Sequence, residues 1–189
     1  MQLVLATRND HKLREFRRLL PGLELEPLPP DVVVPPEDGD TYVANALIKA
    51  RAATAALGRA AIADDSGVEA AALGGRPGVR SARFAGEQAT DEENLARLRA
   101  DASAGSPLRY VCVIAHVAPD GTETCFYGAC AGTLAGEARG EGGFGYDPAF
   151  IPEDIPDGRT MAELDDAEKD AISHRGRAAR ALLGWLAEG

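Results

Sequence analysis

The order of hydrophobic and polar residues predicts that the chain opens with a strand, a tight loop and a helix. An apolar run at 3–7 is typical of a short buried strand. Apolar residues then recur at helical spacing over 13–20, and either Asn9 or Asp10 is placed to cap the start of that helix. The Pro-rich stretch that follows, up to residue 36, keeps neither period and is expected to be irregular.

A second helix and a second strand continue this alternation. Residues 43–57 place apolar side chains on one helical face, and either Asp40 or Thr41 is positioned to begin the helix. The apolar run that follows predicts a strand ending at the adjacent aspartates Asp64 and Asp65. Strands that alternate with helices indicate a layered α/β fold.

The pattern then changes from alternation to a hairpin. A glycine-rich loop at 74–90 leads to a helix that begins at Thr90, where Glu93 completes a capping box. Two apolar runs, 109–118 and 122–135, flank a Pro-Asp-Gly turn, which is a strong hairpin signal. An antiparallel pair added to the earlier strands makes the predicted sheet mixed.

The last part of the chain predicts loops and a final helix. Residues 136–150 are too rich in glycine for regular structure, and 160–164 carry a second capping box that opens a short turn of helix. Apolar residues over 178–186 predict a helix that starts near Ser173. No repeat, linker or low-complexity tract divides the chain, so we expect a single domain over residues 1–189.

Composition narrows the class of protein. The 189 residues are 45% hydrophobic, which is enough to bury one substantial core. No run approaches the roughly 20 apolar residues of a membrane span, and the start lacks the basic region of a signal peptide. We therefore expect a cytoplasmic protein with no membrane partner. The formal net charge of −10 argues against binding to nucleic acid, which selects a basic patch.

The three cysteines predict neither a zinc site nor a disulfide framework. Cys112, Cys125 and Cys130 are odd in number, and none has the paired spacing of zinc ligands. Because Cys112 and Cys125 lie in apolar, strand-like runs, we expect both to be buried free thiols.

Cations gather in the loop after the first strand. Arg8, His11 and Lys12 lie at a helix start, where the dipole is already positive, so an anion is expected beside them. Among the 20 basic residues, only Lys12, Lys49 and Lys169 are lysine. Each is therefore a candidate for a role that needs a compact point charge. Backbone N–H groups at a helix start together with a lysine suit a phosphate. The loop is not a Walker A motif, so a solvated basic turn stays the alternative.

The adjacent aspartates Asp64 and Asp65 require a partner. Two like charges repel, and burial adds to the cost of keeping both ionised. With an acidic loop before the second helix and the candidate phosphate loop, they form the parts of a Mg²⁺-nucleotide site. Mg²⁺ takes one or two carboxylates together with waters and phosphates. In the alternative, one aspartate caps the following turn and the other is solvated.

Other polar and aromatic positions indicate a binding site only when they are taken together. Asn45 and Lys49 lie four residues apart on one helical face, which could look into a cleft or into water. Phe144 stands among glycines, where its ring could stack on a base or anchor a loop. His174 and Arg175 begin a helix, and Arg175 could donate two hydrogen bonds to a planar acceptor or lie at the surface.

Five stretches occur in the order and spacing of the inosine triphosphate pyrophosphatase family, and they cover nearly the whole chain. They are LATRNDHK, DGDTYVANALIKA, ADDSGVEAAALGGRPGVRSARFAG, GGFGYDP and EKDAISHRG. All three lysines fall inside them. The chain therefore resembles the noncanonical purine nucleoside triphosphate pyrophosphatases.

This resemblance implies a two-lobed α/β fold around a long mixed sheet, with the active-site cleft between the lobes, and a homodimer. It also implies Mg²⁺-assisted hydrolysis of ITP, dITP, XTP and dXTP to the monophosphate and pyrophosphate, which cleanses the nucleotide pool. Water would attack the α-phosphate.

The resemblance also assigns roles to individual residues. Glu37 and Asp65 would hold the metal, with Asp65 as the catalytic carboxylate. Lys49 and Lys169 would contact phosphates or order the site. The other substrate-binding residues are the triphosphate loop Thr7, Arg8, Asn9, Asp10, His11 and Lys12, Ser66 beside the metal, the base cradle Phe144, Gly145, Tyr146 and Asp147, and His174 and Arg175 at the base edge.

Two positions depart from the family pattern. The first loop usually carries a glycine where Arg8 or His11 stands here, which bears on its backbone path. Ala44 replaces a glutamate common in the family, which bears on the order around Asn45 and the metal.

Other functions stay open beside this one. A related pyrophosphatase could prefer another base, for instance a modified pyrimidine, and a panel of nucleotides would decide. A nucleotide-binding regulator would show tight Mg²⁺-dependent binding without release of pyrophosphate. A phosphoaspartate-type phosphatase is poorly supported, because its two aspartates are separated by one residue whereas Asp64 and Asp65 are adjacent.

Overall fold

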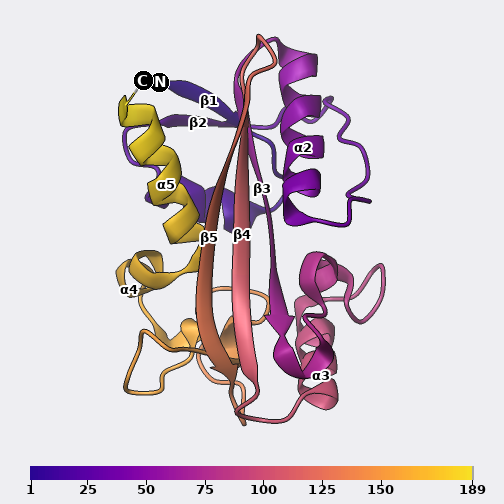
Figure 1. Cartoon of the computed structure of the whole chain (residues 1–189), viewed down its shortest axis with the longest axis vertical. Coiled ribbons are helices and arrows are strands. Elements are labelled where there is room, and N and C mark those ends of the chain that lie inside the picture. Colours follow the sequence, from indigo (N-terminus) through magenta and orange to yellow (C-terminus); the bar gives the residue numbers. More distant parts are fainter. Residues whose placement is uncertain (189) are drawn as a thin grey trace. The chain divides into compact units, whose positions relative to one another are not determined.

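The computed structural model describes residues 1–188 and contains a six-stranded sheet in the order β2-β1-β3-β4-β5-β6 (Figure 1). β1 pairs in parallel with β2 and β3, whereas β5 pairs antiparallel with β6. The prediction of a mixed sheet is therefore confirmed. The strands are β1 (Gln2–Leu5), β2 (Glu24–Pro27), β3 (Ala61–Ala70), β4 (Pro107–Val117), β5 (Glu123–Leu134) and β6 (Phe150–Pro152).

Side-chain caps define where the helices begin. Asn9 accepts hydrogen bonds from the backbone of the first turn of α1, and Thr41 does so for α2, which settles the two open choices of cap. Thr90 and Glu93 form the predicted capping box of α3. Within 1–188, no helix is long and apolar enough to cross a membrane. The helices are α1 (Asp10–Leu19), α2 (Tyr42–Leu57), α3 (Asp91–Asp101), α4 (Asp166–Ile172) and α5 (His174–Glu188), with short 3₁₀ turns η1 (Ala71–Leu73), η2 (Gly78–Arg83), η3 (Asp147–Ala149) and η4 (Met161–Glu163).

Contacts within the chain divide it into two compact units. Unit 1 comprises Met1–Asp65, Cys112–Gly128 and the chain from Ala178, and unit 2 comprises Ser66–Val111 and Ala129–Arg177. The boundaries fall inside β3, β4, β5 and α5, so each of these elements contributes residues to both units.

Alternation along the strands gives unit 1 two hydrophobic cores. Leu3 and Leu5 of β1 belong to one core and Val4 to the other, because successive side chains of a strand point to opposite faces. Side chains of α1 and α5 pack into the first core, and Ala46 and Ala50 of α2 pack into the second. Within this unit, α2 and α5 accordingly lie on opposite sides of the strands (Figure 1).

In unit 2, one core joins strands, a helix and the loops around them. Val68 of β3, Leu98 of α3, Tyr110 of β4 and Phe150 of β6 are all buried in the same cluster. Most of these positions are strand residues whose neighbours face the other way, as the alternating pattern requires.

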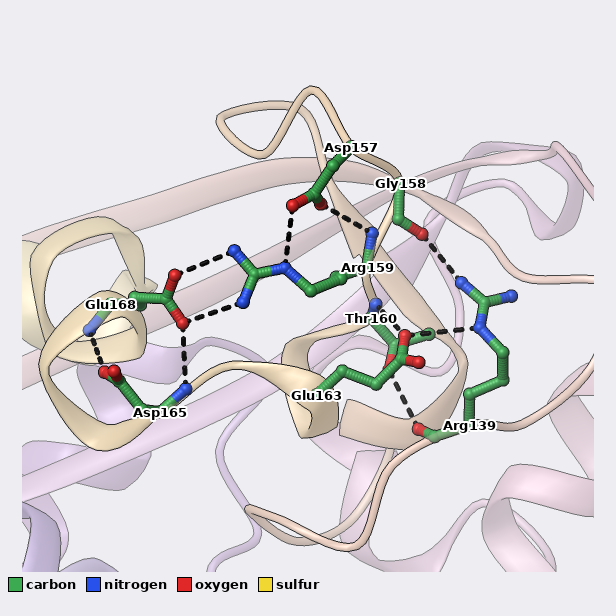
Figure 2. Close-up of polar contacts among 8 residues, drawn as sticks. All are labelled: Arg139, Asp157, Gly158, Arg159, Thr160, Glu163, Asp165 and Glu168. Atoms are coloured by element: carbon green, nitrogen blue, oxygen red, sulfur yellow. Dashed lines mark hydrogen bonds and ion pairs between the residues drawn. The ribbon is translucent and has the colours of Figure 1, made fainter.

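A fork of charged groups fastens the segment before α4 in unit 2 (Figure 2). Arg159 donates to both carboxylate oxygens of Glu168, at 2.9 and 2.7 Å, and to Asp157 at 2.8 Å. Hydrogen bonds from Arg159 lower the pKa of Glu168 to about 2. Glu168 also accepts from the backbone N–H of Asp165, which closes a capping box at the start of α4. The fork therefore fixes the helix that carries Lys169.

Two predicted elements need correction, and one helix was missed. The strand predicted to end at Asp64 and Asp65 continues to Ala70, because Val68 and Ala70 keep the alternation and are buried. The stretch predicted as irregular contains β2, which gains its regularity from pairing with β1. The final helix α5 begins at His174, next to the predicted start near Ser173, whereas the separate helix α4 before it was not predicted. Ser173 caps the end of α4, and its hydroxyl accepts from the N–H of Gly176 in α5.

Two predictions of burial were wrong. Val43, on the predicted apolar face of α2, is 42% exposed, because the buried residues of this helix begin only at Asn45 and Ala46. Cys125 is exposed, because β5 turns its neighbour Phe126 to the core and Cys125 to the opposite side. Cys112 is a buried free thiol as expected.

Candidate active site

The two aspartates of β3 in unit 1 have different partners. Asp64 is 1% exposed, and its Oδ2 lies 2.9 Å from Nζ of Lys12. Asp65 is 5% exposed, and its Oδ2 accepts a hydrogen bond of 3.1 Å from Nδ2 of Asn45. Because consecutive side chains of a strand point to opposite faces, the two like charges are separated and each meets its own donor.

The polar face of α2 lies inside unit 1 and not in water. Asn45 and Lys49 are both buried, and Nζ of Lys49 lies 3.0 Å from Oε1 of the half-exposed Glu37. Burial raises the pKa of Asp65 to about 6, although Lys49, Lys12 and the hydrogen bond from Asn45 each lower it. Glu37 raises this pKa further, as a second negative charge does.

Asn45 also holds the acidic loop that carries Glu37. Its Oδ1 accepts a hydrogen bond of 2.9 Å from the backbone N–H of Gly39. A Cβ on Gly39 would lie 2.7 Å from the Cβ of Ala44, so the loop packs directly on the first turn of α2. One side chain thus connects the loop before α2 with Asp65 of β3.

The residues of unit 1 fit a Mg²⁺ ion. No group of three or more His, Cys, Asp or Glu able to hold a metal occurs in residues 1–188. Mg²⁺ commonly takes only one or two carboxylates, however, and completes its octahedron with waters and phosphates. Asp65 and Glu37 could supply those two, and the raised pKa of Asp65 is the signature of a buried carboxylate that a cation would keep ionised.

Several polar groups of the first loop, residues 7–12, form hydrogen bonds within the protein itself. Oδ1 of Asn9 accepts from the N–H groups of His11 and Lys12, at 2.9 and 3.1 Å. The guanidinium of Arg8 donates to backbone carbonyls over 28–32 and so holds the Pro-rich stretch. Thr7 accepts from the N–H of Asn9. The binding of a triphosphate by these residues stays a prediction.

In unit 2, Asp147 is a buried anchor for the predicted base cradle. Its Oδ2 accepts hydrogen bonds from Nζ of Lys169 at 2.7 Å and from the backbone N–H of Phe144 at 2.9 Å. Lys169 is 4% exposed and Asp147 3%. Of the two roles expected for Lys169, the contacts with Asp147 and its loop favour ordering of the site.

Phe144 presents its ring to two cations. Nζ of Lys169 lies 5.4 Å and the guanidinium carbon of Arg175 5.5 Å from the ring centroid, within the range of cation–π attraction. Arg175 is 2% exposed and donates to Oγ of Ser66 at 3.1 Å. The predicted residues Ser66, Phe144, Lys169 and Arg175 therefore form one cluster within unit 2.

Two further contacts fix the backbone of the same loop. The N–H of Gly145 donates to Oδ2 of Asp91, at the start of α3, at 2.9 Å. The hydroxyl of Tyr146 donates to the carbonyl of Ser81 at 2.7 Å. The glycine-rich loop, predicted to lack regular structure, is therefore held at several points.

Tyr110 of β4 is a neighbour of this cluster that sequence reasoning missed. Its hydroxyl donates to Oδ1 of Asp147 at 3.0 Å, and its ring stacks on that of His174 with centroids 4.4 Å apart at 9°. Burial, and then the charge of Asp147, raise the pKa of Tyr110 well above 10. The signal in the sequence was a tyrosine in a buried strand, because a buried hydroxyl needs a partner.

Comparison with known proteins identifies relatives along the whole chain. A dITP/XTP pyrophosphatase of Symbiobacterium thermophilum is 50% identical over 191 residues, covering 98% of this chain and 94% of the relative. One of Cutibacterium acnes is 46% identical over 193 residues, covering 96% and 94%. The expected enzyme class, a hydrolase of phosphoanhydride bonds, agrees with these names.

Solved structures share the fold. A HAM1 protein from Coxiella burnetii has a TM-score of 0.87 and 41% identity, with both chains covered completely. A nucleoside-triphosphatase, or dITP/XTP pyrophosphatase, from Mycobacterium abscessus has a TM-score of 0.74 and 43% identity over 97% of this chain and 99% of that one. The family model described as the Ham1 family matches residues 3–185, and the chain belongs to this family.

Proposed function

We propose that this protein hydrolyses the noncanonical purine nucleotides ITP, dITP, XTP and dXTP to the nucleoside monophosphate and pyrophosphate, with Mg²⁺ as cofactor. The observation that carries the proposal is Asp65, a buried carboxylate whose pKa of about 6 suits a group that binds a cation and takes a proton near neutral pH. The names of the relatives support the substrate class.

The residues of unit 1 would act on the phosphates. Lys12 and Lys49 offer ammonium groups to the triphosphate, and Glu37 and Asp65 would hold the ion. When bound, Mg²⁺ offsets phosphate charge and makes a coordinated water more acidic. Asp65 accepts the proton of the water that attacks the α-phosphorus. The bond to the bridging oxygen breaks, and the pyrophosphate leaves with its added charge offset by the lysines.

The residues of unit 2 would recognise the base. The ring of Phe144 offers a surface for stacking, and Arg175 and His174 offer donors to a 6-oxo group. The 6-amino group of adenine would meet these donors with its own N–H, leaving buried polar groups unpaired. Sites built on such hydrogen bonds can discriminate by roughly 10⁴–10⁵-fold.

One experiment tests the reaction. Purified protein is given ITP, XTP, GTP and ATP with Mg²⁺ or with EDTA, and pyrophosphate and phosphate are measured separately. We expect pyrophosphate and IMP from ITP, with Mg²⁺ only, and little product from ATP. Release of phosphate from ITP would refute the proposal. Faster turnover of modified pyrimidine nucleotides would favour the related pyrophosphatase, and tight binding without product would favour a regulator.

The proposal includes the assembly and the place of action that the resemblance implies. The protein would act as a homodimer in the cytoplasm, where the nucleotide pool lies. Sedimentation equilibrium at micromolar concentration tests the dimer, and a monomer that retains full activity would remove it from the proposal.

A further inference from the structure

We propose that Tyr110 is a positioning residue for base selectivity, which holds Asp147 and His174 at a fixed spacing. This inference rests on the proposed function and deepens it. Tyr110 contacts one group from each of the two segments assigned to the base, the loop of Asp147 through its hydroxyl and the start of α5 through its ring.

The hydroxyl contact completes the hydrogen bonding of a buried carboxylate. Asp147 accepts from three donors, which come from β4, α4 and its own loop: the Tyr110 hydroxyl at Oδ1, and Nζ of Lys169 and the N–H of Phe144 at Oδ2. A carboxylate held at both oxygens cannot rotate about its own axis without losing a bond. Because Asp147 in turn holds the N–H of Phe144, the hydroxyl of Tyr110 restricts where the Phe144 backbone lies.

The ring contact restricts the second segment. The rings of Tyr110 and His174 are nearly parallel at 4.4 Å, and Phe150 packs on Tyr110 at 4.4 Å and 34°. Tyr110 is 6% exposed and His174 4%, so neither ring has room to turn freely. Arg175 follows His174 directly, and its guanidinium lies 5.5 Å from the Phe144 ring. The plane of Tyr110 thus fixes the imidazole beside the group proposed to read the base edge.

Loss of the hydroxyl alone separates these two effects. Tyr110→Phe keeps the ring that stacks on His174 and removes the donor to Oδ1 of Asp147. Of the three donors to Asp147, only Lys169 and the N–H of Phe144 would then remain, both at Oδ2, so the carboxylate could rotate and Phe144 could shift relative to Arg175. Discrimination by hydrogen bonds depends on fixed donor positions, so the variant should accept the 6-amino base more readily.

The test compares inosine and adenosine nucleotides in two independent measurements. Pyrophosphate release gives kcat and KM for ITP and ATP, and calorimetry gives the Kd for IMP and AMP. For Tyr110→Phe we expect the preference for ITP over ATP in kcat/KM to fall about tenfold, through KM, with kcat for ITP within about twofold. The Kd ratio should fall similarly. Tyr110→Leu, which also removes the stack, should lose more of the preference.

Tyr127→Phe is the matched control, because it removes the same atom from a tyrosine of β5 that is 55% exposed. It should leave both ratios unchanged. If Tyr110→Phe keeps the wild-type preference, or lowers kcat equally for both nucleotides together with Tm, Tyr110 has only a structural role and the inference is overturned.

Failure of the proposed function has a different signature. A wild-type protein that releases no pyrophosphate but binds IMP more tightly than AMP would refute the hydrolysis, and the Kd ratio of Tyr110→Phe would still decide the role of Tyr110. A wild-type protein with neither activity nor base preference would overturn both.

Discussion

The two units of the molecule each bury a carboxylate, but they treat it differently. In unit 2, Asp147 is matched by three donors, one of them the buried ammonium of Lys169 at 2.7 Å. In unit 1, Asp65 accepts from the neutral amide of Asn45, and burial raises its pKa to about 6 despite the field of two lysines. Asp147 is therefore a fixed structural anchor, whereas burial makes the charged form of Asp65 costly.

The cations of the two units differ in the same sense. Lys169 is paired with a carboxylate that is itself almost wholly buried, while Lys49 is paired with Glu37, whose side chain is 40% exposed. A buried ion pair depends on both partners, because either one alone pays a large desolvation cost. The ion pair of unit 2 therefore has both partners buried, whereas the ion pair of unit 1 has one partner in contact with solvent.

The largest effect is expected from neutralising Asp65. Asp65→Asn keeps the shape and the contact with Asn45 but removes the charge and the proton acceptor. We expect kcat for ITP to fall by about 10²–10⁴-fold, the usual contribution of a positioned acid or base. Pyrophosphate release measures it. Asp64→Asn is the control from the other face of β3, and an equal loss in both variants would contradict a special role for Asp65.

Breaking the buried pair of unit 2 should cost the most stability. Lys169→Met leaves Asp147 buried without its cation, and we expect a loss of about 3–5 kcal/mol in the free energy of unfolding. Lys49→Met should cost less than about 1 kcal/mol, because its partner can be hydrated. Urea denaturation followed by circular dichroism measures both. Equal losses would contradict the difference between the two pairs.

The same denaturation experiment tests whether 1–189 is one domain. Trp185, the one tryptophan of the sequence, belongs to unit 1, whereas Lys169→Met acts in unit 2. The urea midpoint of Trp185 fluorescence is compared with the urea midpoint of circular dichroism, both measured on Lys169→Met. If the two midpoints coincide, the units unfold as one cooperative domain, as the sequence predicts. Separate transitions would mean two folding units.

A smaller effect is expected at Gly143, where the loop of unit 2 lies close to Asp147. Gly143 has φ +69°, and a Cβ there would overlap Oδ2 of Asp147. Gly145 has φ +64° but no atom within 4 Å of its Cβ position. Both alanine variants should lose about 1–3 kcal/mol of stability through left-handed backbone strain. Only the additional loss in Gly143→Ala then reports the overlap. Thermal denaturation should give a lower Tm, and ITP hydrolysis a higher KM, for Gly143→Ala than for Gly145→Ala. Equal values for the two variants would refute the close approach.

Most of the fold was predictable because local signals decided it. The caps at Asn9, Thr41 and Thr90 and the hairpin turn depend on neighbours in sequence, and each appears in the structure. β2 was missed because its regularity comes from pairing with β1 and not from its own residues. The end of β3 was misplaced because Asp64 and Asp65 resemble a strand terminus, whereas Lys12 and Asn45 offset their burial.

The candidate site was predictable in its charges but not in its pairings. The three lysines were marked as functional, yet the sequence could not tell that Lys169 meets Asp147, 22 residues away, or that Arg8 holds the backbone over 28–32. The partner of Tyr110 could not be predicted for the same reason. Its role depends on Asp147, 37 residues later, and such contacts follow from the fold and not from local pattern.

The smallest effect concerns a buried imidazole in unit 1. Burial lowers the pKa of His116 below its usual 6.5, and its ring lies 5.0 Å from that of Trp185. The unfolded chain takes up a proton near pH 6.5 that the native ring resists, so this group's contribution to stability is present above pH 6.5 and lost as the pH falls below it. Urea midpoints from Trp185 fluorescence at pH 7.5 and 5.5 measure the loss. His116→Gln should remove part of the pH dependence, and because all other titrating groups are shared, an unchanged difference between the two midpoints would show that His116 is already solvated in the native protein.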